Sequence, residues 1–135
     1  MNDLQVIQEG LHKDFNTEIV IKAYDLIRND PMVLKHVNGF DEMYLITEEH
    51  VHVLNGNWGK KGCECKTFDF DKLKGFQLFR LDSQDAIALL EEKFKPVCVL
   101  TFTHLSDTLN VMRKLYEQHV INDPTLDPNV PKRFD

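Results

Sequence analysis

The sequence predicts an α+β fold in which N-terminal helices pack on an antiparallel β-sheet and a C-terminal helix closes the domain. Two observations predict it: apolar residues recur with the helical period at both ends of the chain, and with the strand period through its middle. A chain of 135 residues, 42% of them apolar, has enough side chains for one core. We therefore expect a single domain over 1–121 and an extended, proline-containing tail over 122–135.

Helices are expected in the N-terminal part. One short helix covers 3–9, and a longer one covers 17–29, where apolar residues fall at three-and-four spacing with charged residues between them. Asp30-Pro31 then sets a capping carboxylate before a proline, the residue type that often opens a helix. A third, short helix is therefore expected over 31–37.

From about Phe40 the apolar pattern alternates, as in an antiparallel sheet with one buried face. The segment 83–94 fits two structures, because Ser83 could cap a helix while the same residues could form one arm of an extended hairpin; we favour the helix. A last helix, 106–120, presents one apolar stripe. The expected strands are 42–47 and 50–54, which form either one strand or two separated by a turn at 48–49, followed by 66–71, 75–81 and 97–104. The stripe consists of Leu109, Met112, Leu115 and Tyr116.

The stretch HVHVLNGNWGKKGCEC, from His50 to Cys65, reads as a β-hairpin around a glycine-rich turn. If the turn is 56–59, His52 lies opposite Cys63 and His50 lies opposite Cys65. Alternation of side chains then separates two faces of the sheet. The buried face would carry Val51, Val53, Phe68 and Phe70, and the other face His50, His52, Cys63, Cys65, Thr67 and Asp69.

Two imidazoles and two thiolates on one patch would suit a tetrahedral zinc ion. However, strand side chains at i and i+2 stand parallel instead of converging on one point, and a slip of one residue would separate the pairs. An ordinary strand surface, facing solvent or covered by a neighbouring helix, is therefore favoured over the zinc site. A reactive thiol at Cys63, close to Lys60 and Lys61, is a third interpretation. The four candidate zinc ligands are His50, His52, Cys63 and Cys65.

Two regions are candidate contacts for a partner protein. Trp58, the only tryptophan, lies at the expected turn tip, where an exposed indole could anchor a partner with Asn57, Lys60 and Lys61 beside it. More often such a ring folds back on its own sheet. The tail contains prolines that exclude a helix or central strand, so it could dock as an extended peptide through Phe134, or fray.

Net charge, apolar runs, cysteine count and missing motifs disfavour several other classes of protein. The net charge is -6 and the charges are interspersed, so a nucleic-acid partner is not favoured. No apolar run approaches the ~20 residues of a membrane span, and the N-terminus lacks the features of a signal peptide. Three cysteines fit reduced thiols, so a cytoplasmic protein is expected. The chain has no GxGxxG, Walker, GxSxG or HExxH motif, so an enzyme is not favoured.

The segment from about Glu42 to His119 resembles the bacterial pleckstrin-homology-like domains. The matching pieces are Tyr44-Leu45-Ile46-Thr47, Phe70-Asp71-Lys72-Leu73 and the final helix. The resemblance implies an open barrel closed by one helix, and a binding platform that presents loops and a sheet edge to proteins or lipids. The basic loop cluster of the phosphoinositide binders is reduced here to Lys60 and Lys61, which favours a protein partner.

The sequence thus predicts a non-enzymatic protein-binding or regulatory module that uses the hairpin tip and the tail. No cofactor is expected for that function. The alternative is a zinc-binding protein or zinc-dependent enzyme with a site on the 50–65 hairpin and Asp69 as a nearby base.

Overall fold

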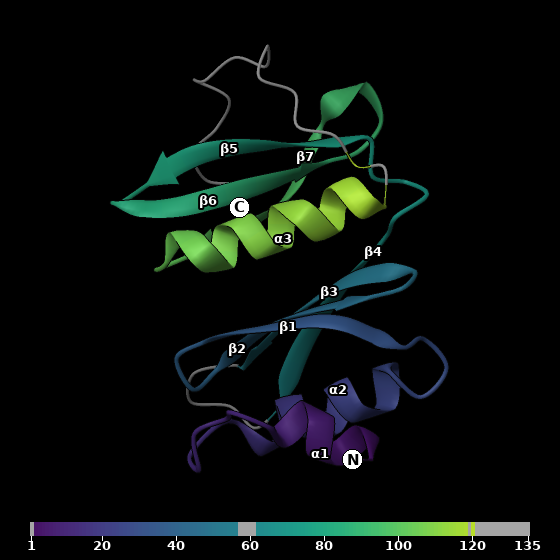
Figure 1. The fold of residues 1–135 in the computed structure, drawn as a ribbon, viewed down its shortest axis with the longest axis vertical. Coiled ribbons are helices and arrows are strands. Elements are labelled where there is room, and N and C mark those ends of the chain that lie inside the picture. Colours follow the sequence, from purple (N-terminus) through teal and green to yellow (C-terminus); the bar gives the residue numbers. More distant parts are fainter. Residues whose placement is uncertain (1, 57–61, 119, 121–135) are drawn as a thin grey trace. The chain divides into compact units, whose positions relative to one another are not determined.

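The computed structural model describes residues 2–56, 62–118 and 120, and the chain divides into two compact units, Met1–Asp69 and Phe70–Asp135 (Figure 1). Each unit is built around its own antiparallel sheet, with four strands in the first and three in the second. The predicted α+β class, with N-terminal helices, antiparallel strands and a C-terminal helix, is confirmed. The expected tail lies outside the described residues, and the single-domain boundary at residue 121 stays a prediction.

The first unit has two helices followed by a four-stranded meander. Asparagine side chains begin both helices: Asn2 forms a reciprocal capping box with Gln5, and Asn16 accepts hydrogen bonds from the amides of Glu18 and Ile19. The strands follow one another in the order β1-β2-β3-β4. The elements are α1 (Asp3–Gln8), α2 (Thr17–Leu26), β1 (Met32–Asn38), β2 (Glu42–Thr47), β3 (His50–Gly56) and β4 (Cys63–Asp69).

The core of the first unit lies between the two helices and one face of this sheet. Helix α2 contacts β2, β3 and β4, and its buried side chains meet those of the strands. Burial of these apolar side chains is the main source of stability for the pairing of helices and sheet. The buried cluster consists of Ile7, Phe15, Ile19, Val20, Ala23, Ile27, Met43, Leu45 and Leu54, with Cys63 and Cys65 packed at its margin.

A lysine ties the first helix to the edge strand β1. The amine of Lys35 donates to the backbone oxygens of Val6 at 3.3 Å and Ile7 at 2.9 Å, at the C-terminal end of α1. A positive charge is favourable there because the last carbonyl groups of a helix have no partner within the helix. Burial lowers the pKa of this amine, with the charge of Glu9 acting in the opposite direction.

The second unit has a three-stranded sheet with a helix across one face. Helix α3 contacts β6 and β7, and the ring of Tyr116 meets that of Phe76 edge-on, with 5.5 Å between centroids. The predicted face of Cys98, Leu100 and Phe102 is buried. The elements are β5 (Gly75–Leu81), β6 (Gln84–Leu90), a 3₁₀ turn η1 (Glu92–Phe94), β7 (Pro96–Phe102) and α3 (Leu105–Glu117), with strand order β5-β6-β7.

The predicted helix over 31–37 is wrong, because these residues form strand β1. Asp30 does not cap a helix; its carboxylate accepts hydrogen bonds from the end of β2 and from the turn after it, including the amide of Glu49 at 3.1 Å. Strand β1 then pairs with β2 along its length. The long-range pairing and the contacts of Asp30 override a local helix-start signal.

The helix favoured over 83–94 is also wrong, and the hairpin arm is correct. Asp82 and Ser83 both have positive φ, 47° and 68°, which is the backbone of a two-residue turn between antiparallel strands. Strand β6 therefore runs back along β5 and also pairs with β7. As a central strand it is buried from Ala86 to Leu90, which explains why its apolar run lacks clear alternation.

None of the helices in the described ranges is long and apolar enough to cross a membrane.

The close approach of Gly56 to the loop before β2 predicts a destabilising substitution. A Cβ atom at this position would overlap the carboxylate of Asp41 and lie 2.6 Å from Nδ2 of Asn16. These two side chains are hydrogen-bonded to each other at 2.9 Å, so neither can move without breaking the contact that holds the start of α2. Gly56→Ala should lower the free energy of unfolding by about 1–3 kcal/mol in urea titrations.

A double-mutant cycle provides the control for this prediction. Asp41→Ala removes the overlapping carboxylate, so adding Gly56→Ala to it should cost less than in the wild-type background. Additive losses would show that the overlap with Asp41 is not the cause.

Candidate functional site

The predicted register of the β3–β4 hairpin is wrong by four residues. His50 lies opposite Asp69 and His52 opposite Thr67, whereas Cys65 lies opposite Leu54. The expected turn began one residue too early, since β3 continues through Gly56 and β4 begins at Cys63. A shift by an even number of residues keeps each side chain on its predicted face, so the histidines and cysteines do share one face of the sheet.

The four predicted zinc ligands are nevertheless not brought together. Among the described residues, the cluster of potential ligands that includes His50 and His52 contains neither Cys63 nor Cys65. The cysteines sit further along the hairpin, half-buried against the core of the first unit. The face they share is covered by helix α2, which agrees with the favoured interpretation of an ordinary strand surface under a helix.

The predicted partner-binding residues lie outside the described residues. Asn57, Trp58, Lys60 and Lys61 fall within 57–61, and Phe134 falls within 121–135.

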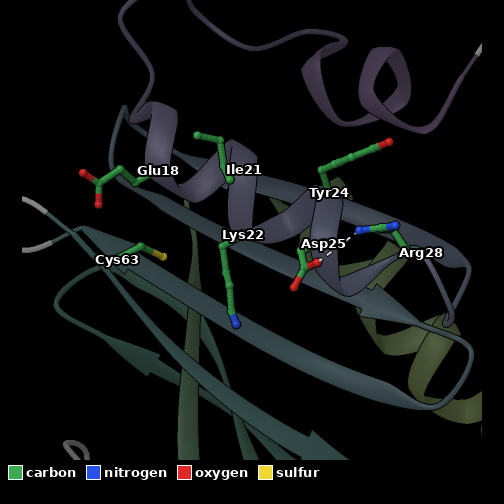
Figure 2. A pocket seen from close by; sticks show the side chains of 7 residues that line it. All are labelled: Glu18, Ile21, Lys22, Tyr24, Asp25, Arg28 and Cys63. Carbon is green, nitrogen blue, oxygen red and sulfur yellow. Dashed lines mark ion pairs between the residues drawn. The ribbon is translucent and has the colours of Figure 1, made fainter.

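A shallow pocket lies beside Cys63, between α2 and the start of β4 (Figure 2). Burial raises the pKa of the Cys63 thiol, and the neighbouring Cys65 raises it further. A thiol held protonated in this way is a poor nucleophile and a poor metal ligand, so the structure does not favour a reactive cysteine. The only ion pair drawn in Figure 2 joins Asp25 and Arg28, neighbours on one helix turn, at 3.7 Å.

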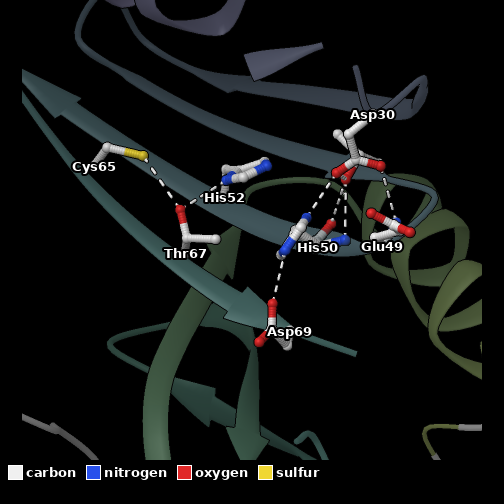
Figure 3. A network of polar contacts seen from close by, with 8 residues as sticks. Asp30, Glu49, His50, His52, Cys65, Thr67 and Asp69 are labelled. Atoms are coloured by element: carbon white, nitrogen blue, oxygen red, sulfur yellow. Dashed lines mark hydrogen bonds and ion pairs between the residues drawn. The ribbon is translucent and has the colours of Figure 1, made fainter. Parts of the chain in front are cut away.

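A network of polar side chains surrounds Asp30 on the histidine face of the sheet (Figure 3). Its carboxylate is 9% exposed and lies 2.7 Å from Nδ1 of His50, and the hydroxyl of Thr47 donates to the same oxygen. The other ring nitrogen of His50, Nε2, lies 2.7 Å from Oδ1 of Asp69. His50 is therefore held between two carboxylates, one before β1 and one at the end of β4.

These contacts shift the pKa values of both partners. Burial alone raises the pKa of Asp30, but hydrogen bonds from His50, Thr47 and the Glu49 amide outweigh it and hold the pKa below 3.8. The hydrogen bond to Asp30 raises the pKa of His50 above 6.5, although its partial burial acts the other way. The charged forms of both groups are thus favoured.

His52, two residues along β3, has the opposite environment. It is 3% exposed, and burial, together with the neighbouring charge of His50, lowers its pKa to about 4. Nδ1 lies 2.8 Å from the hydroxyl of Thr67. Within the part of the chain that the structure describes, Nε2 of His52 is the one buried side-chain nitrogen or oxygen without a hydrogen-bond partner. Figure 3 draws this end of the ring toward Asp30.

The sequence interpretation missed Asp30 as a member of this network. Asp30 precedes a proline, and this pair resembled a helix start. One signal could have identified Asp30: it lies between two apolar segments, and an aspartate that is buried must accept hydrogen bonds from nearby donors.

A second candidate lies on helix α3, where four apolar side chains form an exposed stripe that we call the α3 seam. Its residues recur every three or four positions, and most are about half exposed, including Leu105 at 62% and Leu109 at 51%. Two adjoining hollows run along it and share Leu109 and Met112, one of them reaching Leu78 on β5. The seam consists of Leu105, Leu109, Met112 and Tyr116.

The predicted stripe of the last helix is therefore split between two faces. Leu115 is fully buried and faces the sheet with Thr108 and Val111, whereas Leu109 and Tyr116 are exposed. The apolar band of α3 is thus wider than the part that packs on its own sheet, so the helix also presents an apolar face. Among the described residues, seven antiparallel strands in sheets of four and three precede this helix.

Two solved structures have the same fold. A pleckstrin homology domain from Shewanella amazonensis SB2B matches with a TM-score of 0.55 and 10% identity, over 76% of this chain and 96% of that chain. A DUF1696 family protein with a pleckstrin-homology domain, from Shewanella loihica PV-4, matches with a TM-score of 0.56 and 11% identity, over 78% and 97%. No family model and no curated protein matches the chain. The fold expected from the sequence resemblance is thus confirmed, and at this identity the fold is what the two structures share.

The buried His52 predicts a loss of stability in acid. Because its pKa is about 4 in the folded chain and 6.5 ordinarily, the unfolded chain binds the proton first as the pH falls from 6.5 to 4. The free energy of unfolding therefore decreases over that window, by at most about 3 kcal/mol from this residue. His50 acts oppositely, since its raised pKa contributes stability below pH 6.5 that is lost as the pH rises through its folded value.

Urea unfolding at a series of pH values in metal-free buffer separates the two histidines. His52→Gln should flatten the decrease between pH 6.5 and 4 relative to wild type. The exposed His104 supplies a matched control, His104→Gln, which should leave the profile unchanged. An unaltered slope in His52→Gln would contradict the assignment.

Proposed function

We propose that this chain is a non-enzymatic protein-binding or regulatory module that holds an amphipathic helix of its partner against the α3 seam. The observation that carries the proposal is the exposure of large apolar side chains at helical spacing on α3. Contiguous exposed apolar patches are uncommon on soluble domains and often mark contact surfaces. A pleckstrin-homology-like fold, with its helix packed on one sheet, provides a rigid support for such a surface.

The spacing of the seam favours a helix as the bound element. From Leu105 to Tyr116 the apolar residues are separated by four, three and four positions, the repeat by which two helices interdigitate. The hollow beside Leu78 and Leu109 continues the apolar surface from α3 onto strand β5. A partner helix with its own apolar side chains at this repeat could fill both hollows.

The charges around the seam favour apolar recognition over phosphate recognition. Arg80 pairs with Asp85 at 2.6 Å, and Lys114 pairs with Glu117 at 3.2 Å. Arg113, which lines the hollow beside Tyr116, donates to the side-chain oxygen of Asn110 at 3.0 Å. Cations already neutralised by carboxylates contribute little to binding a phosphate backbone or an anionic lipid headgroup. A protein partner is therefore favoured, and nucleic acid is not.

The hairpin tip and the tail remain additional proposed contacts. Trp58 and Phe134 are the residues there with the largest apolar side chains. The three free cysteines fit a reducing compartment, so we propose that the module acts in the cytoplasm.

Selection from a displayed random-peptide library tests the seam with a defined probe. Enriched peptides should carry apolar residues at i, i+3, i+4 and i+7, and Leu109→Asp should weaken their binding by about tenfold or more, measured by fluorescence anisotropy. Ile21→Asp is the matched control because Ile21, at 62% exposure, is also a large apolar side chain at the surface but lies on α2. Trp58→Ala and a chain lacking 122–135 report whether the tip or the tail contributes.

Sedimentation at several protein concentrations tests whether the α3 seam binds a second copy of the chain instead of a helix of a partner. Self-association of the wild type that Leu109→Asp abolishes would mean that the seam binds another α3, and the partner-helix proposal would be wrong. Enriched peptides whose affinity is equal for wild type and Leu109→Asp would also overturn it.

A further inference from the structure

We infer that Asp30, His50 and His52 form a binding site for a divalent first-row transition-metal ion of the zinc type, separate from the α3 seam. One donor atom from each of the three side chains lies within 4.8 Å of the others. In a tetrahedral zinc site the donor atoms are about 3.3 Å apart, because each bond is about 2 Å long. The three side chains thus need only a small closure to share one ion.

The strongest observation for a ligand is the unpartnered nitrogen of His52. This side chain is almost completely buried, yet Nε2 has no hydrogen-bond partner among the described residues. A buried polar atom left without a partner costs about 1–3 kcal/mol, so such atoms call for an explanation. An ion bound between Nε2 and the carboxylate of Asp30 would satisfy it, and Figure 3 draws the two facing each other.

In each of the two imidazoles, the ring nitrogen that would face away from the ion already has the kind of hydrogen-bond partner that metal-binding histidines use. Nε2 of His50 lies 2.7 Å from the Asp69 carboxylate, and Nδ1 of His52 lies 2.8 Å from the Thr67 hydroxyl. Such partners fix the tautomer and orientation of a ligating ring and make it a better ligand. They leave Nδ1 of His50 and Nε2 of His52 as the two nitrogen ligands.

The chemistry of the set defines the ion. Two imidazole nitrogens and one carboxylate oxygen suit zinc and its neighbours in the first transition row better than calcium or magnesium, which prefer oxygen alone. Binding would displace the proton shared by Nδ1 of His50 and Asp30, and this proton leaves to solvent. Three protein ligands leave one tetrahedral position for water or for a group of a partner.

The bound ion would act as a clasp within the first unit. Asp30 precedes β1, His50 begins β3 and His52 lies further along β3, so one ion would join the segment before the first strand to the centre of the sheet. This set differs from the His₂Cys₂ hypothesis, since it replaces both thiols with Asp30. The two sets can be distinguished by experiment.

Zinc titration of the chelator-treated full chain, by calorimetry and by thermal unfolding, tests the site. The wild type should bind zinc stoichiometrically, and zinc should raise its Tm. Asp30→Asn and His52→Gln should each weaken binding by about tenfold or more and remove the Tm increase. The Cys63→Ser, Cys65→Ser double variant should bind as the wild type does, and bound cobalt should show no thiolate charge-transfer absorption.

A further variant keeps the test valid if substitution of the buried Asp30 or His52 impairs folding. Thr67 is exposed on β4, and its hydroxyl contacts Nδ1 of His52, the nitrogen away from the proposed ion, and the Cys65 thiol at 3.7 Å. Thr67→Val should therefore fold and still weaken zinc binding by about 10–100-fold. The inference is wrong if the wild type binds no zinc, if Asp30→Asn and Thr67→Val bind it unchanged, or if binding is lost in the cysteine double variant.

Discussion

The first unit depends on one buried carboxylate, that of Asp30. An isolated carboxylate out of water is strongly unfavourable, so its position must be fixed by donors. The donors come from Thr47 at the end of β2, from the Glu49 amide in the turn and from the imidazole of His50. The segment before β1 is thereby held against the turn of the next hairpin. Residues 32–38 then pair with β2, with one register shift between Met32 and Leu34, instead of continuing the helical run before them.

The central strands of the first sheet are apolar on both faces. Val51 and Val53 point to one side and His52 and Leu54 to the other, and all four are buried. Helix α2 covers the second of these faces. This explains how a histidine can lie in the core of the unit without charge. It also explains why the histidine and cysteine face of the hairpin is a covered strand surface, one of the two arrangements that the favoured interpretation allowed.

The local sequence pattern was sufficient to predict a helix or strand wherever a single apolar period, helical or alternating, dominates the segment. Helix α2 and strand β7 were predicted from spacing alone, because each buries one regular stripe or face. Strands β1 and β6 were not, because Asp30 and Ser83 imitate helix caps and only pairing with the neighbouring strands corrects that signal. The register of β4 against β3 depends on the length of the connection between these strands, and the alternation of apolar residues does not reveal that length. The exposure of the α3 seam was not predicted, because a sequence shows that a face is apolar but not whether it is covered.

The contact of Lys35 with α1 bears on how the protein is prepared. Its ammonium group lies on the backbone oxygens that end the first helix, so those residues neutralise a partly desolvated charge on the edge strand. A chain shortened to begin at α2 would lack the backbone oxygens that accept hydrogen bonds from Lys35. It would also lack Ile7, so the side chains that Ile7 contacts in the hydrophobic cluster would be exposed to solvent. The first ten residues are therefore an integral part of the folded unit, and an expression boundary drawn at the strands would cut through it.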